Sequence, residues 1–395
     1  MTQKTPRRFH LGLLPRIIIA IILGILLGLV APDWLGRLCA TFNGIFSQFL
    51  NFLIPLIIIG FVAPAIADIG NSAGKMLVVT ALLAYAFTIM AGYISYLTGT
   101  TVFPSLIQAE PSLATVESAP GVTPWFEMPI PAVMPVMTAL VLSFLLGLGI
   151  AYTSGNVLRE AADQFRDIVG KTINKALIPL LPLYIFGIFL CMTVVGQVAV
   201  ILSTFAKIIV VIFVLHVAVL ILQYVIASLF AGRNPLRMLW TMLPAYFTAL
   251  GTQSSAATIP VTLRQAIKMG VSEEVAGFVV PLCATIHLSG STLKIVACAL
   301  ALMIMQGIPY DAALFTHFIA MLGITMIAAP GIPGGAIMAS LGLLSSILGF
   351  SDAQNAMMIA LYIAMDSFGT ACNVTGDGAI AAIVNRIFSK KAIHN

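Results

Sequence analysis

Two short stretches, GTQSS at residues 251–255 and APGIPGG at residues 329–335, each interrupt a long apolar segment. The interrupted segments run over 238–262 and 313–346, and both are otherwise apolar enough to enter a lipid bilayer. Clusters of glycine, proline and serine end helices. Broken backbone at membrane depth is tolerated only where it is buried in protein or lines a cavity. The two breaks therefore predict a pair of re-entrant helical hairpins that enclose a transport site.

The composition of the whole chain is that of a polytopic α-helical membrane protein. Of the 395 residues, 60% are apolar and only 8% are charged, and the mean hydropathy is +1.07. A soluble domain carries about 25% charged residues, so a soluble enzyme, a nucleic-acid binder and a disordered protein are excluded. Eight uninterrupted apolar runs are long enough to span, and they cover 12–31, 45–67, 76–97, 132–152, 177–198, 205–230, 275–305 and 356–383.

The distribution of basic residues predicts the orientation. With the N-terminus in the cytoplasm and both interrupted segments turning back, one from each side, 16 of the 19 basic residues lie inside. Loop 98–131, which carries Glu110, Glu117 and Glu127 and no basic residue, then lies outside. We therefore expect cytoplasmic termini, and we interpret the basic N-terminus with its apolar run as a first span and not a signal peptide. The inside residues are Lys4, Arg7, Arg8, Arg16, Lys75, Arg159, Arg166, Lys171, Lys175, Arg233, Arg237, Arg264, Lys268, Arg386, Lys390 and Lys391.

The last apolar run carries a stripe of polar side chains: Asp366, Thr370, Asn373 and Asp377. At about 100° per residue, these positions fall within an arc of about 60° on one helix face. An ionisable residue at the bilayer centre costs about 2.5–3.5 kcal/mol on insertion scales. The two carboxylates are therefore expected to face cations or a substrate ammonium group, with a structural polar network between helices as the alternative.

A second polar stretch, TIHLSG at 285–290 followed by Ser291, interrupts the seventh run. Gly290 among small polar residues predicts local unwinding, and unwound carbonyl oxygens suit Na⁺. His287 is either part of such a site or simply hydrogen-bonded to a neighbouring helix. Lys294 shares a face with His287 if the helix continues, as a fixed charge near a cation site or as a snorkelling side chain. The five scattered cysteines are interpreted as small buried apolar residues.

Three motifs in order give the chain a resemblance to a known family. They are SSAATIPVT at 254–262, GIPGGAIM at 331–338 and NVTGD at 373–377. These stretches are similar to the two hairpin motifs and the eighth-helix motif of the dicarboxylate/amino acid:cation symporter family, the glutamate-transporter homologues. The resemblance covers nearly the whole chain and is most specific from Thr252 to Arg386.

The resemblance implies an elevator-type transporter with eight transmembrane helices and two re-entrant hairpins, assembled as a homotrimer. Residues 1–75 and 132–204, with spans one, two, four and five, would form the scaffold. Residues 76–131, with span three and the external loop, would join 205–395 in a moving transport domain.

The resemblance also implies the site. Asp366 would hold a substrate amino group, while Asn373 and the hairpin tips would hold its carboxylate. Asp377 and Asn373 would bind one Na⁺. The substrate-binding set is Gln253, Ser254, Ser255, Ser291, Gly331, Ile332, Pro333, Gly334, Asp366, Gly369, Thr370 and Asn373. The cation-binding set is Cys283, Thr285, His287, Met326, Ala329, Asn373 and Asp377.

Four departures from the family pattern shape the expected chemistry. HLSGS at 287–291 replaces the family's N-M-D-G-T, so an acidic ligand of a deep sodium becomes Ser289 and its Asn partner becomes His287. The third span offers Ala81, Ala84 and Tyr85 where the family has a tyrosine and a Thr-Ser pair, so we predict that the deep site is absent. Gly369 replaces an arginine that pairs with acidic substrates, Tyr362 replaces a third carboxylate, and the second hairpin tip is one residue shorter.

The predicted function is symport of a small neutral amino acid such as serine, threonine or alanine. The coupling cation is Na⁺, and the chain has no catalytic residues and no other cofactor.

A rival hypothesis is coupling by protons through His287, because histidine ordinarily titrates near physiological pH. Another is transport of an amine-free mono- or dicarboxylate, with Lys294 paired to Asp366 or to the substrate. A remote alternative is an intramembrane aspartyl hydrolase, but Asp366 and Asp377 lie about 16 Å apart along a helix. The expected location is the inner or plasma membrane, without a nucleic-acid partner.

Overall fold

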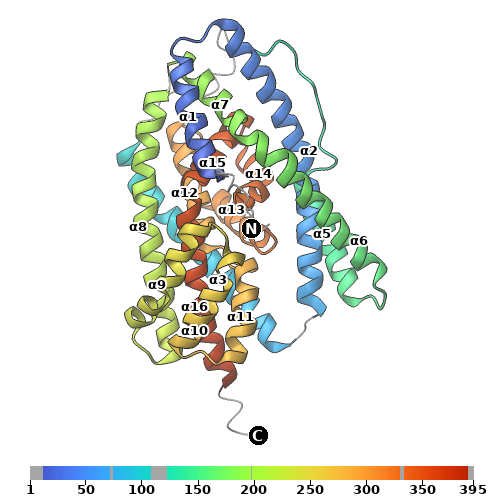
Figure 1. Ribbon diagram of the computed structural model, residues 1–395, viewed down its shortest axis with the longest axis vertical. Helices are drawn as coiled ribbons and strands as arrows, with labels where there is room; N and C mark the ends of the chain where they lie inside the picture. Colours follow the sequence, from blue (N-terminus) through green and yellow to red (C-terminus); the bar gives the residue numbers. More distant parts are fainter. Residues whose placement is uncertain (1–11, 72–73, 108–121, 197, 330–332, 390–395) are drawn as a thin grey trace, which may run out of the picture.

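The computed structural model describes residues 12–71, 74–107, 122–196, 198–329 and 333–389, and all regular secondary structure in this part of the chain is helical (Figure 1). Its helices before the first hairpin are α1 (Leu13–Gly28), α2 (Asp33–Asn71), α3 (Lys75–Leu106), α5 (Val136–Tyr152), α6 (Val157–Thr172), the π-helical turn η1 (Ile173–Leu177), α7 (Ile178–Val194) and α8 (Val198–Ala231). Those that follow are α9 (Pro235–Thr252), α10 (Ser255–Met269), α11 (Glu273–Ile286), α12 (Ser289–Met305), α13 (Ala312–Met326), α14 (Gly335–Leu348), α15 (Asp352–Ala364) and α16 (Asp366–Ser389).

Each predicted span coincides with apolar helix, although several helices run beyond the apolar runs. In the described residues, five helices are long and apolar enough to cross a membrane, or six if α15 and α16 form one bent span. α1, α5, α13 and α14 are shorter apolar helices. The chain therefore has the helices of a polytopic membrane protein, and the count of eight spans stays a prediction.

One predicted boundary is wrong. Helix α3 continues to Leu106, so the expected loop 98–131 begins as helix. Further along the chain, α6, η1 and α7 form one continuous helical run over Val157–Val194 without a turn between them.

The two interrupted segments form helix pairs, as the glycine and serine clusters predict. Gln253 ends α9 in the left-handed conformation (φ 54°), and Ser254 then caps α10 by accepting from the backbone N–H of Ala257. Such a serine satisfies one of the unpaired N–H groups at a helix start. The second pair, α13 and α14, is separated by a break that ends at Gly334, whose φ of 75° favours glycine. Within each pair the helices pack against each other.

The two remaining spans are interrupted in ways that the sequence did not predict fully. The seventh breaks at His287 and Leu288, so Gly290 belongs to α12 and is not itself unwound. The last run is not one straight helix, because α15 and α16 meet at Met365 with a bend of 63°. At this bend the backbone N–H of Met365 donates a hydrogen bond of 3.2 Å to the carbonyl oxygen of Tyr362, three residues earlier in the chain.

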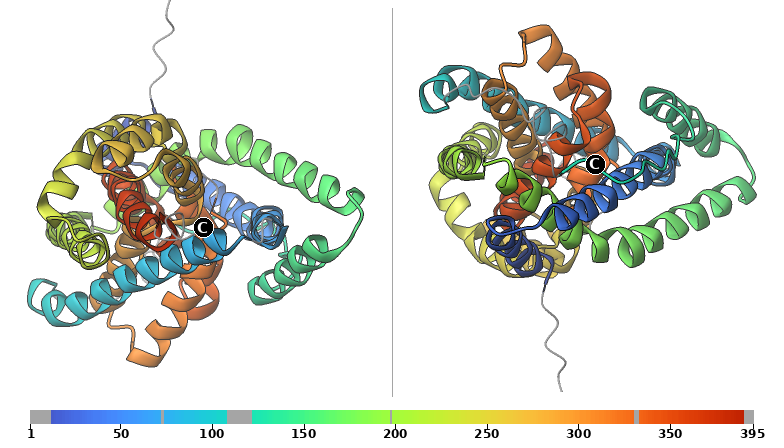
Figure 2. Two further views of the ribbon diagram at one scale, coloured as in Figure 1. Left: turned by 90° about the horizontal axis from the view of Figure 1, so that it is seen from below. Right: turned by 90° about the horizontal axis from the view of Figure 1, so that it is seen from above.

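Helix α16 lies in the middle of the C-terminal half, where α8, α9, α10, α11 and α12 all pack against it. Figures 1 and 2 show α5 and α6 standing to one side, where they pack on α2. The polar stripe predicted on the last span is therefore enclosed by helices, and Asp366 is its first residue.

Candidate functional site

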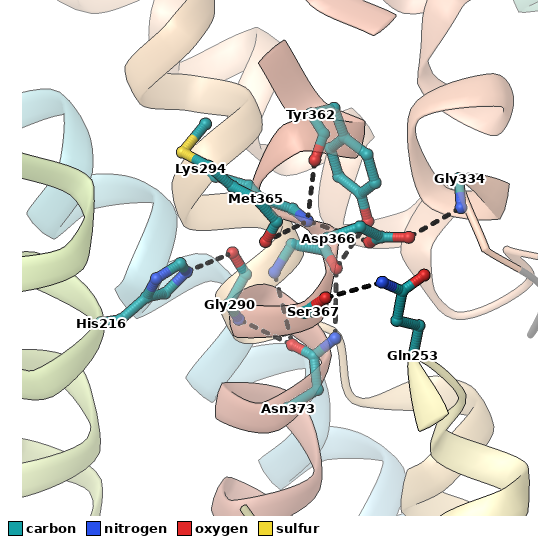
Figure 3. A network of polar contacts seen from close by, with 11 residues as sticks. His216, Gln253, Gly290, Lys294, Gly334, Tyr362, Met365, Asp366, Ser367 and Asn373 are labelled. Carbon is teal, nitrogen blue, oxygen red and sulfur yellow. Dashed lines mark hydrogen bonds and ion pairs between the residues drawn. The ribbon is translucent and has the colours of Figure 1, made fainter. Parts of the chain in front are cut away.

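The breaks of the two hairpins meet at the start of α16 (Figure 3). Gln253, at the first break, donates from Nε2 to the hydroxyl of Ser367 over 2.8 Å. Gly334, at the second break, donates its backbone N–H to Oδ2 of Asp366 over 2.9 Å. Two segments more than 80 residues apart in sequence thus touch neighbouring residues of one helix end, as the resemblance implies.

Asp366 has a second partner in Lys294. The ammonium nitrogen lies 3.0 Å from Oδ1 of the carboxylate, and both side chains are buried. The same nitrogen lies 3.4 Å from the carbonyl oxygen of Met365 and 3.5 Å from that of Tyr362. It also lies 3.4 Å from the centre of the Tyr362 ring, a cation–π distance. Of the two sequence interpretations of Lys294, a fixed internal charge is correct, because the side chain does not reach a lipid interface.

Asn373 connects α16 to the start of α12. Its Oδ1 accepts the backbone N–H groups of Gly290 (2.8 Å) and Ser291 (3.3 Å). Its Nδ2 donates to the Ser291 hydroxyl over 3.1 Å, and the Tyr362 hydroxyl donates to the same oxygen over 2.9 Å. The polar groups at the α12 N-terminus are therefore engaged with α15 and α16.

A small cavity lies between these groups. Its lining contains eight of the residues expected at the site: Gln253, Ser255, Thr285, Ser291, Ala329, Asp366, Thr370 and Asn373. It also contains four residues that the sequence did not single out as lining: Ala284, Leu288, Ala336 and Tyr362. The lining combines carboxylate, amide and hydroxyl groups with apolar side chains, which suits a small ligand that has polar and apolar parts.

Gly369 lies next to Lys294 and lacks a side chain where one would collide with it. A Cβ atom built at Gly369 would lie 2.7 Å from Nζ and 2.8 Å from Cε of Lys294. The lysine thus fills the space beside α16 that the missing side chain leaves. Gly369 is accordingly covered by Lys294 and does not line the cavity in the described residues.

The other expected hairpin-tip residues divide into two groups. Ser254 is used as the cap of α10, and Pro333 is half-buried in the turn before Gly334. Gly331 and Ile332 lie outside the described residues.

The expected cation ligands lie in two places. Thr285 and Ala329 line the cavity, and Met326 is buried at the end of α13. Cys283, His287 and Asp377 form a separate buried group below it, where the carbonyl oxygen of Cys283 accepts the N–H of His287. The ring nitrogen Nδ1 of His287 lies 2.9 Å from Oδ1 of Asp377. The histidine therefore binds the carboxylate that the resemblance assigns to sodium.

The sequence predicts that the deep sodium site is absent, and the structure places Ser289 and Gln223 together in that region. Ser289 accepts a hydrogen bond from Nε2 of Gln223 over 3.0 Å, while Tyr85 turns away and donates to the carbonyl of Ala320. Four buried polar atoms of the described residues here have no hydrogen-bond partner: Thr88 Oγ1, Gln223 Oε1, His287 Nε2 and Thr375 Oγ1.

Sequence reasoning missed Gln223 and His216 as parts of this region. The Nε2 atom of His216 lies 3.1 Å from the carbonyl oxygen of Gly290. Both residues come from α8, a long apolar helix in which single polar residues are the available signal.

Comparisons with known proteins agree with this geometry. Residues 13–387 match the sodium:dicarboxylate symporter family. The chain is 29% identical to the proteins named serine/threonine transporter SstT of Acinetobacter baumannii strains AYE and AB0057. Each alignment runs over 397 residues and covers 95% of this chain and 97% of the relative. The similarity thus extends over nearly the whole chain and is not confined to the candidate site.

Proposed function

The chain belongs to the sodium:dicarboxylate symporter family, whose members are transporters and not enzymes, and we propose that it carries a small neutral amino acid across the membrane together with Na⁺. The observation that carries this proposal is the position of Asp366, at the edge of a small polar cavity between the two helix breaks. A carboxylate held there suits a substrate ammonium group, and Asn373 and the nearby helix N-termini suit its carboxylate.

Two observations support a substrate with a neutral side chain: residue 369 is a glycine and not an arginine, and the relatives are named serine/threonine transporters. No arginine lines the cavity in the described residues, and residue 369 is a glycine. An acidic substrate side chain would therefore be buried without a positively charged partner from residue 369, which carries a large desolvation cost. The names of the relatives given above point to serine and threonine as the first substrates to test. Alanine belongs to the same size class.

The elevator mechanism, the homotrimer and the domain division stay part of this proposal. Residues 1–75 and 132–204 form the scaffold in it, and residues 76–131 and 205–395 move. The extensive packing of α8, α9, α10, α11 and α12 on α16 supports a common moving body. Cytoplasmic termini complete the proposed arrangement.

An amine-free carboxylate is the second candidate substrate, and the Lys294–Asp366 ion pair favours it. Because Lys294 already neutralises Asp366, the carboxylate has less need of a substrate ammonium group. Glycerate, the hydroxy-acid analogue of serine, separates the two candidates. If the substrate is an amino acid, a large excess of glycerate leaves uptake of labelled L-serine nearly unchanged, whereas an amine-free substrate site binds glycerate and ignores serine.

The coupling ion is tested in the same system. Uptake of labelled L-serine into proteoliposomes is measured with an inward sodium gradient and, separately, with an inward proton gradient. Sodium-driven uptake supports the proposal. Proton-driven uptake that His287→Gln abolishes supports coupling through the His287–Asp377 pair instead, and proton-driven uptake unchanged by His287→Gln rules that pair out. No serine uptake under either gradient contradicts the amino-acid proposal and directs the test to carboxylates.

A further inference from the structure

Lys294 is a completely buried cation whose three N–H groups all have acceptors in the protein. Its exposed fraction is 0%, and the acceptors are Asp366 Oδ1 and the carbonyl oxygens of Tyr362 and Met365. An ammonium group has three donors, so none is left over for a ligand. Lys294 is also absent from the lining of the cavity in the described residues. Its charge thus serves the protein and not the substrate directly.

The bend between α15 and α16 places both charges of the pair at favourable helix ends. The ammonium of Lys294 lies against carbonyl groups at the C-terminal end of α15, and Asp366 is the first residue of α16. Helix C-termini favour cations and helix N-termini favour anions. Because α12 packs on α15 and on α16, the two charges belong to one packed unit.

The other carboxylate oxygen of Asp366 binds the second hairpin. Oδ2 accepts the N–H of Gly334 at the second helix break, and Asp366 is only 4% exposed. A carboxylate buried in this way without a cation would carry a large desolvation penalty. Lys294 is the side chain that supplies the cation, as the 3.0 Å contact shows.

We propose that Lys294 is a tethered counter-cation, which allows the second hairpin to close over Asp366 when no substrate is bound. The inference rests on the proposed function, because closure without substrate is what lets an empty carrier return across the membrane. During loading, a substrate ammonium group takes the oxygen that Gly334 holds, while Lys294 keeps the other oxygen. The empty carrier then needs no cation from the opposite side at this carboxylate.

The closure itself is tested without any substrate. A cysteine is introduced at Ala336, which lines the cavity on α14, and its reaction with a maleimide is followed in the purified protein. The same chain without this cysteine gives the background from the five native cysteines, which are all buried. Lys294→Met is expected to speed labelling about tenfold or more, because unpaired Asp366 requires water. Adding Asp366→Asn to Lys294→Met removes the unpaired charge and is expected to restore slow labelling.

Two results would overturn the proposal. One is unchanged labelling in Lys294→Met. The other is fast labelling that Asp366→Asn does not reverse, which would mean that Lys294 only supports the bend between α15 and α16. Neither result depends on the identity of the substrate, so this assay decides the inference even if the proposed amino-acid transport fails.

Transport assays then test the consequence for the cycle. In Lys294→Met, net uptake of labelled L-serine is expected to fall about tenfold or more, while exchange against internal unlabelled L-serine is retained. The reason is that exchange returns the carrier loaded, with the substrate ammonium group as the partner of Asp366. Lys294→Arg keeps the charge and is the matched variant in which net uptake persists. Equal losses of exchange and net uptake in Lys294→Met would contradict a counter-cation that acts only on the empty carrier.

Discussion

At the scale of single residues, Asp366 divides its two carboxylate oxygens between a permanent and an exchangeable partner. Lys294 is buried on the same packed unit, whereas the N–H of Gly334 belongs to the second hairpin, whose Ala329 and Ala336 line the cavity. In the proposed mechanism, a substrate ammonium group competes with Gly334 and not with the lysine. This division reconciles a buried ion pair with a site for an amino acid.

Asp366→Asn tests the contact with the ammonium group. We expect the affinity for L-serine to fall about tenfold to hundredfold, because a hydrogen bond to a charged group contributes about 1.5–3 kcal/mol. The amide still accepts a hydrogen bond from Lys294, but the buried lysine loses its counter-anion, so thermal unfolding of the purified variant is measured beside its affinity. Inhibition constants from competition with labelled L-serine measure the loss. Affinity retained at the level of the unaltered chain would show that Asp366 does not bind the amine.

Asp377→Asn tests the proposed cation site below the cavity. Replacing the carboxylate by an amide removes the charge that a hard cation requires, so half-maximal uptake is expected to need about tenfold more sodium. The control is Asp163→Asn on α6, which removes only an exposed 3.0 Å ion pair with Arg166. A sodium response that is the same in both variants would reject Asp377 as a sodium ligand.

The polar stripe on α16 could be predicted from sequence, but its partners could not. Spacing along one helix is a local property, so Asp366, Asn373 and Asp377 were identified correctly as one face. The contact of Lys294 with Asp366 joins residues 72 positions apart. It depends on the bend at Met365 and on how α12 packs against it, which no local spacing encodes.

At the scale of helices, α12 and α16 approach each other so closely that only glycine fits between them. A Cβ atom at Gly290 would lie 2.6 Å from Cβ of Cys372 and 2.7 Å from the carbonyl oxygen of Gly369. This contact brings the N–H of Gly290 to Asn373. The function of Gly290 is therefore close packing, and the unwinding that the sequence predicted lies just before it, at His287 and Leu288.

Gly290→Ala is expected to destabilise the protein by about 2 kcal/mol or more, because the added methyl meets backbone that cannot rotate away. Gly277→Ala on α11 is the matched control, since no atom lies within 4 Å of its Cβ position. There, alanine is expected to be neutral or to stabilise the helix by up to about 1 kcal/mol. Thermal unfolding followed by size-exclusion chromatography measures both. Equal melting temperatures for the two variants would contradict the packing argument.

The helix breaks differ in whether the sequence predicts them. The breaks at Gln253 and before Gly334 lie in glycine, serine and proline clusters, and these residues identified them. The bend at Met365 lies in the sequence LYIAMDSF, which contains no glycine or proline. At this bend the ammonium group of Lys294 donates to the carbonyl oxygens of Tyr362 and Met365. Because Lys294 lies far away in the sequence, this cause of the bend belongs to the tertiary structure.

At the scale of the whole molecule, the positions of the basic residues bear on the orientation of the chain in the membrane. Glu127 and Asp352 line one cavity together, beside the end of the second hairpin. The base of the first hairpin instead touches the end of α16, where Ser272 donates its N–H to Asn385. The basic residues of α6 and of the first hairpin lie in segments that the charge rule assigns to the cytoplasm.

Labelling with a membrane-impermeant maleimide tests this orientation in intact cells. Glu127→Cys is expected to react from outside, and Asp163→Cys only after the membrane is permeabilised, because α6 carries the basic residues Arg159, Arg166 and Lys171. Glu127 is exposed in the folded chain, and Asp163 is half-buried with a side chain that is 42% accessible, so the reagent can reach both positions from their own side of the membrane. The reverse pattern would place the termini outside and overturn the proposed topology.

The collision between Gly369 and Lys294 constrains how the chain could evolve or be redesigned. Any side chain at 369 needs the volume that the lysine occupies. A lineage that gained an arginine at 369 first would pass through an intermediate with two cations crowded beside one carboxylate. Losing Lys294 first leaves an intermediate with a vacant space and an uncompensated anion. The two positions are therefore epistatic, and a change of selectivity by this route requires both substitutions to be made together.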